Sequence, residues 1–257
     1  MVLSLSVLPI GFLIGVAACV LRIFLLLPAQ KSSGRSRLSD NTSGTRKLAV
    51  FLGSGGHTSE AIALLSSLDY ARFSSRIYIV GDGDTLSTQK AIDLESKKCA
   101  SSSEQNVRHL FFFAVWTIPR ARRVHQSLLS SPLTALWSLL RCMQHVTISP
   151  LLSSSSASQP FADVLILNGP GTCLSLCIAI YVNKFIGLPV PKLIYVESFA
   201  RVHSLSLSGK LLRPLVDRYR VIDPTDPVWP YPSPRFVVQW PQPLTDGGRG
   251  DCFGWLV

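Results

Sequence analysis

A glycine-rich turn between a strand-like run and a helix-like run is the feature that most restricts the fold of this chain. The turn, Gly53-Ser-Gly-Gly-His-Thr58, follows Leu48–Leu52 and precedes Glu60–Leu65. Glycine lets the backbone turn tightly and approach a ligand closely, and the N-terminus of a helix carries a partial positive charge. The unit is therefore typical of an α/β fold and of a phosphate or diphosphate site. A plain turn whose helix is capped by Ser54 or Thr58 is the alternative interpretation.

The spacing of this turn does not fit the two best-known nucleotide motifs. Thr58 stands where a dinucleotide fingerprint has its third glycine, and no Gly-Lys-Ser/Thr follows as in a P-loop. We therefore expect neither NAD nor ATP, and we predict no cofactor. The six cysteines are scattered without Cys-x-x-Cys pairs, which favours reduced thiols and predicts no metal site.

Strand-like runs alternate with helix-like runs along the chain. The strand-like runs are Leu48–Gly53, Arg76–Gly81, Val107–Phe113, Val164–Asn168, Leu193–Val196 and Phe236–Trp240. The helix-like runs are Thr58–Leu68, Thr85–Lys98, Arg123–His145, Thr172–Phe185 and Leu205–Arg218. This alternation predicts an α/β fold with one doubly wound parallel sheet. Ligands of such sheets bind at the carboxyl ends of the strands.

Two further polar loops follow predicted strands and should open on the same edge of the sheet. Asn168-Gly-Pro-Gly-Thr172 is a second glycine turn before a helix, and Glu197-Ser198 with Arg201-Val-His203 follows another strand. Together with the first turn they favour a site for a phosphorylated ligand. The predicted substrate-binding residues are Gly53, Ser54, Gly55, Gly56, Thr58, Asn168, Gly169, Gly171, Thr172, Ser198 and Arg201.

The N-terminus predicts a membrane anchor. Val2–Leu21 is almost entirely apolar and Ile23–Leu27 extends the run past Arg22, which is enough for a span of about 20 residues. A signal peptide is disfavoured because no basic segment precedes the run. Basic residues follow it, so the positive-inside rule puts the remaining chain in the cytosol. We expect an anchor at 1–27, a basic flexible linker at 28–46, an α/β domain at 47–245 and a tail at 246–257.

The basic excess and one apolar stretch suggest further contact with lipid. The net charge is +10, but no zinc-finger spacing, RNA-recognition aromatics or long basic run is present, so we expect no nucleic-acid partner. Arg120, Arg122, Arg123 and Arg141 bracket a leucine-rich stretch that includes Trp137. That stretch is either an amphipathic helix in the membrane interface or an ordinary core helix, and Pro132 interrupts its pattern.

Several segments resemble the family of the fourteenth asparagine-linked glycosylation protein, in the right order and after a similar anchor. The similar segments are Gly53–Thr58, Ile118–Ser127, Asn168–Thr172, Tyr195–Ser198 with Arg201–His203, Leu205–Lys210 and Val238–Pro241. The proline-rich piece Ile222–Pro234 and the glycine-rich end Asp246–Asp251 depart from the family pattern.

The resemblance implies the N-terminal, Rossmann-like half of a split GT-B glycosyltransferase. Such a subunit binds the acceptor, GlcNAc-diphosphodolichol, at the cytosolic face of the endoplasmic reticulum membrane or the nuclear envelope. It recruits a soluble catalytic UDP-GlcNAc transferase subunit and is inactive alone. The implied docking residues for that partner are in the tail: Phe253, Trp255, Leu256 and Val257.

The implied chemistry is attack of an acceptor hydroxyl on the donor sugar, for which His57 is a candidate general base. Glu60 or Glu197 could orient His57 or replace it, and the sequence does not rank them. Two other functions stay open: a self-sufficient membrane glycosyltransferase, which would need a second nucleotide-binding domain, and a scaffold without a ligand site.

Overall fold

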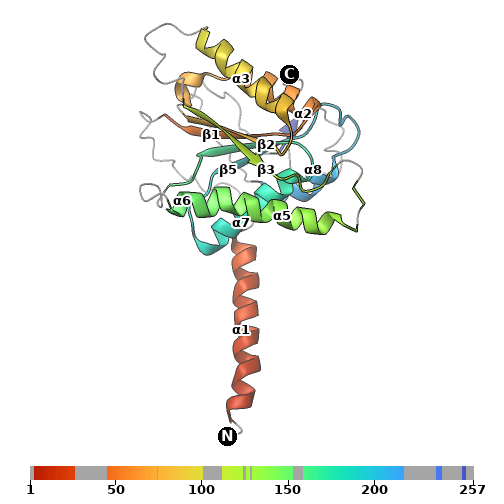
Figure 1. Ribbon diagram of the computed structural model, residues 1–257. Coiled ribbons are helices and arrows are strands. Elements are labelled where there is room, and N and C mark those ends of the chain that lie inside the picture. The colour runs from red at the N-terminus through yellow and green to blue at the C-terminus, as the bar shows by residue number, and fades with distance from the viewer. Residues whose placement is uncertain are drawn as a thin grey trace.

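The computed structural model describes residues 3–26, 45–73, 75–100, 112–123, 126–127, 129–152, 159–216, 236–238 and 251–252 (Figure 1). In these residues the strands form one sheet in the order β3-β2-β1-β4-β5-β6-β7, and all neighbours are parallel. The strands are β1 (Lys47–Leu52), β2 (Ser75–Gly81), β3 (Phe113–Ile118), β4 (Val164–Asn168), β5 (Lys192–Val196), β6 (Phe236–Val238) and β7 (Asp251–Cys252).

Helices cover both faces of the sheet. They are α1 (Leu3–Leu26), α2 (Gly56–Ser66), α3 (Thr85–Ala100), α5 (Ser131–Met143), α6 (Ser149–Leu152), α7 (Thr172–Ile186) and α8 (Leu207–Leu212), with a 3-10 turn η1 (Tyr70–Arg72) and a π-helical turn η3 (Gln144–Ile148). Helices α2 and α3 pack together on one face, and α5 packs against α7 on the other. This arrangement confirms the predicted doubly wound parallel sheet.

The central strand β1 is buried on both faces, as a covered parallel sheet requires. Ala49 and Phe51 belong to the core shared with α5 and α7, whereas Leu48, Val50 and Leu52 belong to the core shared with α2 and α3. The run of apolar residues in this strand is therefore continuous, without the alternation of a half-exposed strand.

Most of the predicted elements are confirmed, but three differ from their predicted bounds. The helix expected at Leu205–Arg218 is present as the shorter α8, which covers Leu207–Leu212. Where we expected a strand at Val107–Phe113, β3 instead begins at Phe113, and residues 101–111 lie outside the described part. Because β3 is at the sheet edge, most of its side chains are partly exposed. The chain is apolar from Leu110 to Trp116, so the sequence does not mark where the strand begins. The helix expected at Arg123–His145 begins only at Ser131. Pro132 lies in the first turn of this helix. Proline is tolerated there because the backbone N–H groups of the first turn have no partner within the helix.

Helix α1 projects from the domain and contacts it at the end of α7 (Figure 1). The Arg22 Nε atom donates to the carbonyl oxygen of Phe185 at 2.7 Å, and the guanidinium lies 5.8 Å from the centre of the Phe185 ring. A cation at this position also suits the negative C-terminal end of α7. In the part of the chain that the structure describes, no helix is both long enough and apolar enough to cross a membrane.

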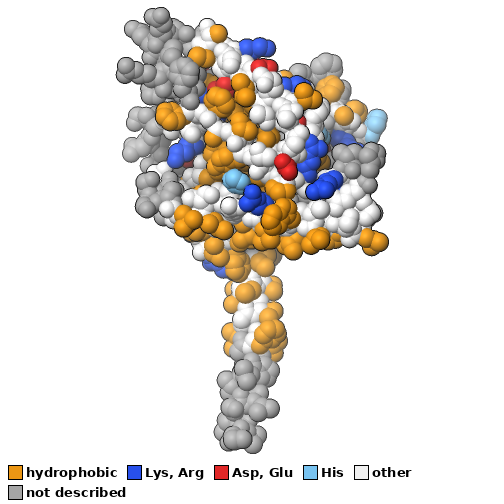
Figure 2. Space-filling view, viewed as in Figure 1, with side chains coloured by type: hydrophobic (Ala, Val, Ile, Leu, Met, Phe, Trp, Pro, Cys, Tyr) orange, Lys and Arg blue, Asp and Glu red, His pale blue; other side chains and the backbone are white. Residues whose placement is uncertain are grey.

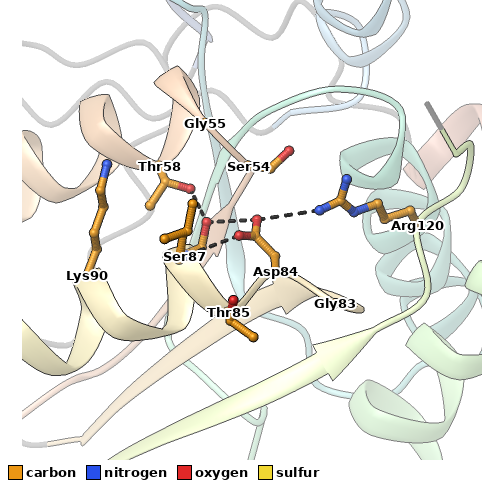
Figure 3. Close-up of a pocket in the computed structure, with 10 residues that line it drawn as sticks. Ser54, Gly55, Thr58, Gly83, Asp84, Thr85, Ser87, Lys90 and Arg120 are labelled. Carbon is orange, nitrogen blue, oxygen red and sulfur yellow. Dashed lines mark hydrogen bonds and ion pairs between the residues drawn. The ribbon is translucent and has the colours of Figure 1, made fainter. Parts of the chain in front are cut away.

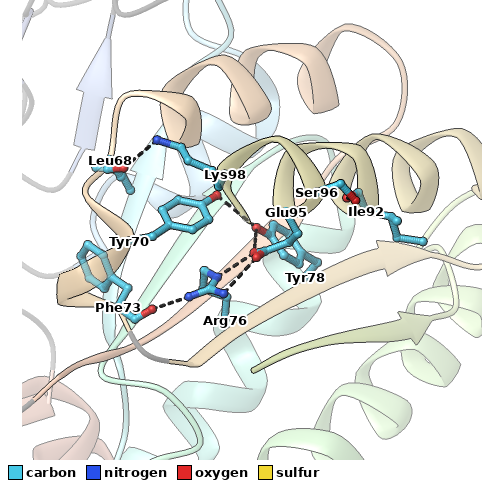
Figure 4. A network of polar contacts seen from close by, with 9 residues as sticks. All are labelled: Leu68, Tyr70, Phe73, Arg76, Tyr78, Ile92, Glu95, Ser96 and Lys98. Atoms are coloured by element: carbon cyan, nitrogen blue, oxygen red, sulfur yellow. Dashed lines mark hydrogen bonds and ion pairs between the residues drawn. The ribbon is translucent and has the colours of Figure 1, made fainter. Parts of the chain in front are cut away.

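A buried ion pair fixes α3 on β2 (Figure 4). Arg76 and Glu95 are at most 5% exposed and form two hydrogen bonds, of 2.6 and 2.9 Å. The Tyr78 hydroxyl donates to Glu95 at 2.6 Å, and the Arg76 guanidinium lies 4.6 Å from the centre of the Tyr70 ring. Burial raises the pKa of Tyr70 to about 12. Each charge is thus paired, which offsets the cost of removing it from water.

Candidate functional site

Two glycine turns meet where the strand order reverses, between β1 and β4. The Gly53 N–H donates to the carbonyl oxygen of Asn168 at 3.1 Å. A Cβ atom on Gly53 would lie 2.7 Å from that oxygen and 2.7 Å from the Gly169 Cα, so the two backbones touch only because no side chain intervenes. In sheets of this type the ligand crevice lies at this reversal, beyond the carboxyl ends of the strands.

The N-terminus of α2 lies at the same edge of the sheet, since the helix follows β1 after a short turn. Gly55 precedes the helix with φ 69°, a left-handed conformation that favours glycine, and no side chain caps the helix. The alternative of a turn capped by Ser54 or Thr58 was therefore wrong. The Thr58 hydroxyl instead lies 2.6 Å from the Ser87 hydroxyl. A Cβ atom at Gly55 or Gly56 would meet nothing within 4 Å, so there is room for a ligand beside these N–H groups.

His57, Asn168 and Glu60 form a chain of hydrogen bonds at this edge of the sheet. The Asn168 amide nitrogen donates to Glu60 Oε2 at 3.3 Å, and its Oδ1 lies 2.8 Å from His57 Nδ1. A carboxylate only accepts, so the amide must turn its NH₂ group toward Glu60 and its oxygen toward His57. Nδ1 of His57 then carries the proton, which leaves Nε2 as the basic nitrogen.

Glu60 is itself held by the loop after β5. Its Oε1 atom accepts from the Ser198 hydroxyl at 2.8 Å and from the Phe199 backbone N–H at 3.2 Å. Glu60 thus joins three loops that the sequence placed on one edge of the sheet, those after β1, β4 and β5. The polar chain from Ser198 through Glu60 and Asn168 to His57 fixes the orientation of the imidazole.

Glu197, the other candidate carboxylate, lies apart from His57 and faces α8. It is 1% exposed, and its Oε2 accepts from both the backbone N–H and the hydroxyl of Ser206, each at 3.1 Å. The Ser206 hydroxyl in turn accepts from the Gly209 N–H and caps α8. A Cβ atom on Gly209 would lie 2.1 Å from Glu197 Oε2. These contacts suit a role in positioning α8.

A pocket of about 320 Å³ lies at the N-terminus of α2 (Figure 3). Its lining comes from the turn after β1, the turn after β2 with the start of α3, and the loop after β3: Ser54, Gly55, Thr58, Gly83, Asp84, Thr85, Leu86, Ser87, Lys90 and Arg120. Lys90 and Arg120 are its two cations, and Asp84 is its one carboxylate. An uncapped helix end and two cations make the pocket suitable for an anion.

Asp84 is already engaged by its own helix. Its carboxylate accepts from the Ser87 N–H at 3.1 Å and the Ser87 hydroxyl at 2.8 Å, which caps α3. The Arg120 Nη2 atom lies 3.8 Å from Asp84 Oδ2. Lys90 donates to the Ser59 hydroxyl at 2.8 Å and is exposed.

Arg120, Lys90, Asp84 and Ser87 were not predicted as site residues. Gly81 is paired with Ile118 across β2 and β3, and the Arg120 side chain crosses Gly81, where a Cβ atom would come within 3.0 Å of Nε. Arg120 could have been predicted as a site residue because it follows the end of β3. The strand was instead predicted at Val107–Phe113, several residues too early.

The other predicted site residues lie around the crevice. Thr172 is buried, and its hydroxyl accepts from the Ala121 N–H at 3.1 Å, which ties the loop after β3 to the start of α7. Gly171 is exposed with open space beside it, and Arg201 is exposed with its N–H bonded to the Ser198 carbonyl. The predicted docking residues Phe253, Trp255, Leu256 and Val257 lie outside the described residues. Among the residues described, no cluster of His, Cys, Asp or Glu could hold a metal.

Comparison with known proteins gives one family. Residues 48–225 match the family model described as "Oligosaccharide biosynthesis protein Alg14 like". The chain is 43% identical over 226 residues to the UDP-N-acetylglucosamine transferase subunit ALG14 of Cryptococcus neoformans, covering 88% of this chain and 86% of that protein. It is 42% identical to the Schizosaccharomyces pombe subunit over 81% and 82% of the two chains, and 37% identical to the Mus musculus subunit over 76% of each. No solved structure matches the chain.

Proposed function

Because the chain belongs to the Alg14-like family of oligosaccharide biosynthesis proteins, we propose that it is the acceptor-binding subunit of a UDP-GlcNAc transferase. In this proposal the complex adds the second GlcNAc to GlcNAc-diphosphodolichol during synthesis of dolichol-linked oligosaccharide. The subunit binds that acceptor and recruits a soluble catalytic subunit, which supplies the UDP-GlcNAc site. The related proteins are named as subunits of a transferase, which supports the proposal that this chain acts together with a second subunit.

The observation that carries the proposal is the uncapped N-terminus of α2 between a cationic pocket and His57. An acceptor diphosphate needs backbone N–H groups and cations, which Gly55, Gly56, Lys90 and Arg120 can supply. The reacting hydroxyl needs a base, and the bond to Asn168 leaves Nε2 of His57 available for that role. A scaffold without a ligand would have no need of these groups together.

The proposed reaction is a simple displacement. The acceptor hydroxyl oxygen bonds to the anomeric carbon of the donor sugar, and the bond from that carbon to UDP breaks. UDP leaves with the electron pair of that bond, and the hydroxyl proton passes to Nε2 of His57. Glu60 acts through Asn168 as a positioning residue, because it lies in the same hydrogen-bonded chain.

We further propose that α1 anchors the subunit and that the domain lies on the cytosolic side of the endoplasmic reticulum membrane. The apolar run of the sequence and the basic residues that follow it support this orientation. The residues at 253–257 are proposed to dock onto the soluble subunit, since they form a short, mostly apolar segment like the one that the resemblance assigns to this role.

The test is transfer of GlcNAc from UDP-GlcNAc to a GlcNAc-diphosphate-polyprenol, with the full-length protein in detergent, alone and with the soluble subunit. Activity only in the mixture is expected. Activity of the chain alone would mean that it is a self-sufficient transferase. Absence of transfer both from the chain alone and from the mixture would favour a scaffold without a ligand site. Removal of residues 253–257 should reduce co-purification of the soluble subunit. Unchanged co-purification would place the docking surface elsewhere.

A further inference from the structure

Helix α5 has an apolar face where a helix on a soluble domain would be polar. Four of its large apolar side chains are at least half exposed and recur at helical spacing: Leu133 at 74%, Leu136 at 52%, Trp137 at 56% and Leu140 at 50%. Exposed apolar residues continue through η3 and α6 at Ile148, Leu151 and Leu152. We call the outer side of these three elements the α5–α6 face.

The inner side of the same helix is packed on the domain and carries small side chains. Ser138 and Cys142 are fully buried, and Val146 continues this side in η3. Helix α5 packs closely against α7. The apolar residues of the α5–α6 face therefore do not take part in packing the core. An exposed apolar patch of this size is typical of a contact surface.

The charges carried by residues 131–152 and by α7 are basic. No Asp or Glu occurs in the 22 residues 131–152 or in the 15 residues of α7. Arg141 lies beside Trp137, with its guanidinium 6.0 Å from the ring centre, and Lys184 is near the end of α7. The helices on the opposite face of the sheet, in contrast, carry Glu60 and Asp93. An aromatic ring and arginine beside aliphatic residues are the composition of helices that lie in a lipid interface.

The position of α1 indicates which surface covers this face. Helix α5 runs across the base of the domain, and α1 leaves that base in a crossing direction (Figure 1). Figure 2 shows hydrophobic side chains gathered along this lower edge on both sides of α1. The bond from Arg22 to the Phe185 carbonyl attaches α1 to α7, directly beside α5. A bilayer crossed by α1 would therefore meet the α5–α6 face.

We propose that the α5–α6 face lies in the interfacial layer of a bilayer that contains anionic lipids. The leucines and Trp137 enter the boundary between headgroups and acyl chains, and Arg141 pairs with lipid phosphate. The domain then has two membrane contacts, α1 and this face. This contact is independent of which sugar is transferred, and it goes beyond the anchoring by α1 proposed above.

The test is photocrosslinking of the full-length protein in vesicles of phosphatidylcholine and phosphatidylinositol. A benzophenone amino acid replaces Leu133, Leu136 or Leu140 in separate variants. The matched control replaces Ile92 on α3, which is 37% exposed on the opposite side of the sheet and does not line the cationic pocket. All four positions are on the surface, and circular dichroism checks that each variant is folded. Phospholipid adducts are identified by the mass of the modified peptide.

Phospholipid adducts at positions 133, 136 and 140, without adducts at position 92, would support the proposal. Absence of adducts from vesicle-bound protein, or equal yields at all four positions, would overturn it. Crosslinks to a second copy or to added soluble subunit in place of lipid would also overturn it, because the face would then be a protein interface. GlcNAc transfer measured in the same vesicles shows separately whether the proposed function holds.

Discussion

The Nδ1 atom of His57 lies 2.8 Å from Oδ1 of Asn168, although the two residues are 111 positions apart in the chain. Asn168 is 2% exposed and is oriented by Glu60, so the imidazole is held in one tautomer. A histidine prepared in this way is suited to receive a proton at Nε2.

Replacing this histidine should stop most of the turnover. We expect His57→Ala to lower the kcat of the assembled complex by about 100-fold or more, the usual effect of losing a general base. Capture of the soluble subunit should be unchanged, and initial rates with pull-down of the subunit measure the two effects. His203→Ala, at an exposed histidine of the loop after β5, is the control. A variant that keeps wild-type kcat would remove His57 as the base.

Arg120 should matter for acceptor binding more than for the chemical step. A charge-assisted hydrogen bond contributes about 1.5–3 kcal/mol, so Arg120→Gln should raise the KM for the acceptor by about tenfold or more. Arg123→Gln removes an exposed arginine that does not line the pocket, and it should have little effect. Equal KM values for both variants and the wild type would show that the pocket does not hold the diphosphate.

The ion pair between Arg76 and Glu95 should be important for stability. Glu95→Ala leaves a buried guanidinium without its carboxylate, and we expect a loss of about 3–5 kcal/mol in the free energy of unfolding. Asp93→Ala changes an exposed acid on the same helix and should alter the value by less than about 0.5 kcal/mol. Urea denaturation in detergent gives both values. Similar losses in the two variants would contradict this account.

His145 should make stability depend on pH. Burial and the nearby Arg141 lower the pKa of this imidazole below its usual 6.5. Below about pH 6.5 the unfolded chain therefore takes up a proton that the folded chain binds only at lower pH, so stability falls with falling pH. Urea denaturation below and above this pH should show that loss, and His145→Gln should reduce it. An identical pH dependence in the variant would exclude His145 as its source.

Deleting residues 1–27 should change the kind of membrane attachment. The full-length protein is expected to resist extraction by alkaline carbonate, because a spanning helix is not released by loss of charge contacts. The deletion variant should keep only the weaker attachment through the α5–α6 face, and high salt should release part of it, since ion pairs with lipid are screened. Release of the full-length protein by carbonate would contradict the anchor, and resistance of the deletion variant to salt would indicate a second strong attachment.

Local patterns were sufficient to predict most of the fold. The apolar run before Gly53 and the helix-like run Thr85–Lys98 depend on neighbouring residues, and the structure confirms both elements closely, as β1 and as α3. Strand β3 was misplaced because the chain is apolar from Leu110 to Trp116, and this run does not mark where the strand begins. Pro132 was interpreted as an interruption, although proline is well tolerated in the first turn of a helix.

The site was less predictable because it depends on side-chain direction. Glu60 and Glu197 both lie near candidate loops in the sequence, but Glu60 turns toward Asn168 and Glu197 turns toward Ser206. No local pattern distinguishes these directions. Arg120 joins the pocket only through the pairing of Gly81 with Ile118 in neighbouring strands, which requires the correct register of β3.

The close approach of Gly53 and Gly169 has a mechanical consequence. Because their backbones touch, the turn after β1 cannot shift toward β4 without displacing the turn after β4. The two turns therefore move together when a ligand binds. A displacement of either turn also displaces the imidazole of His57, which is bonded to Asn168.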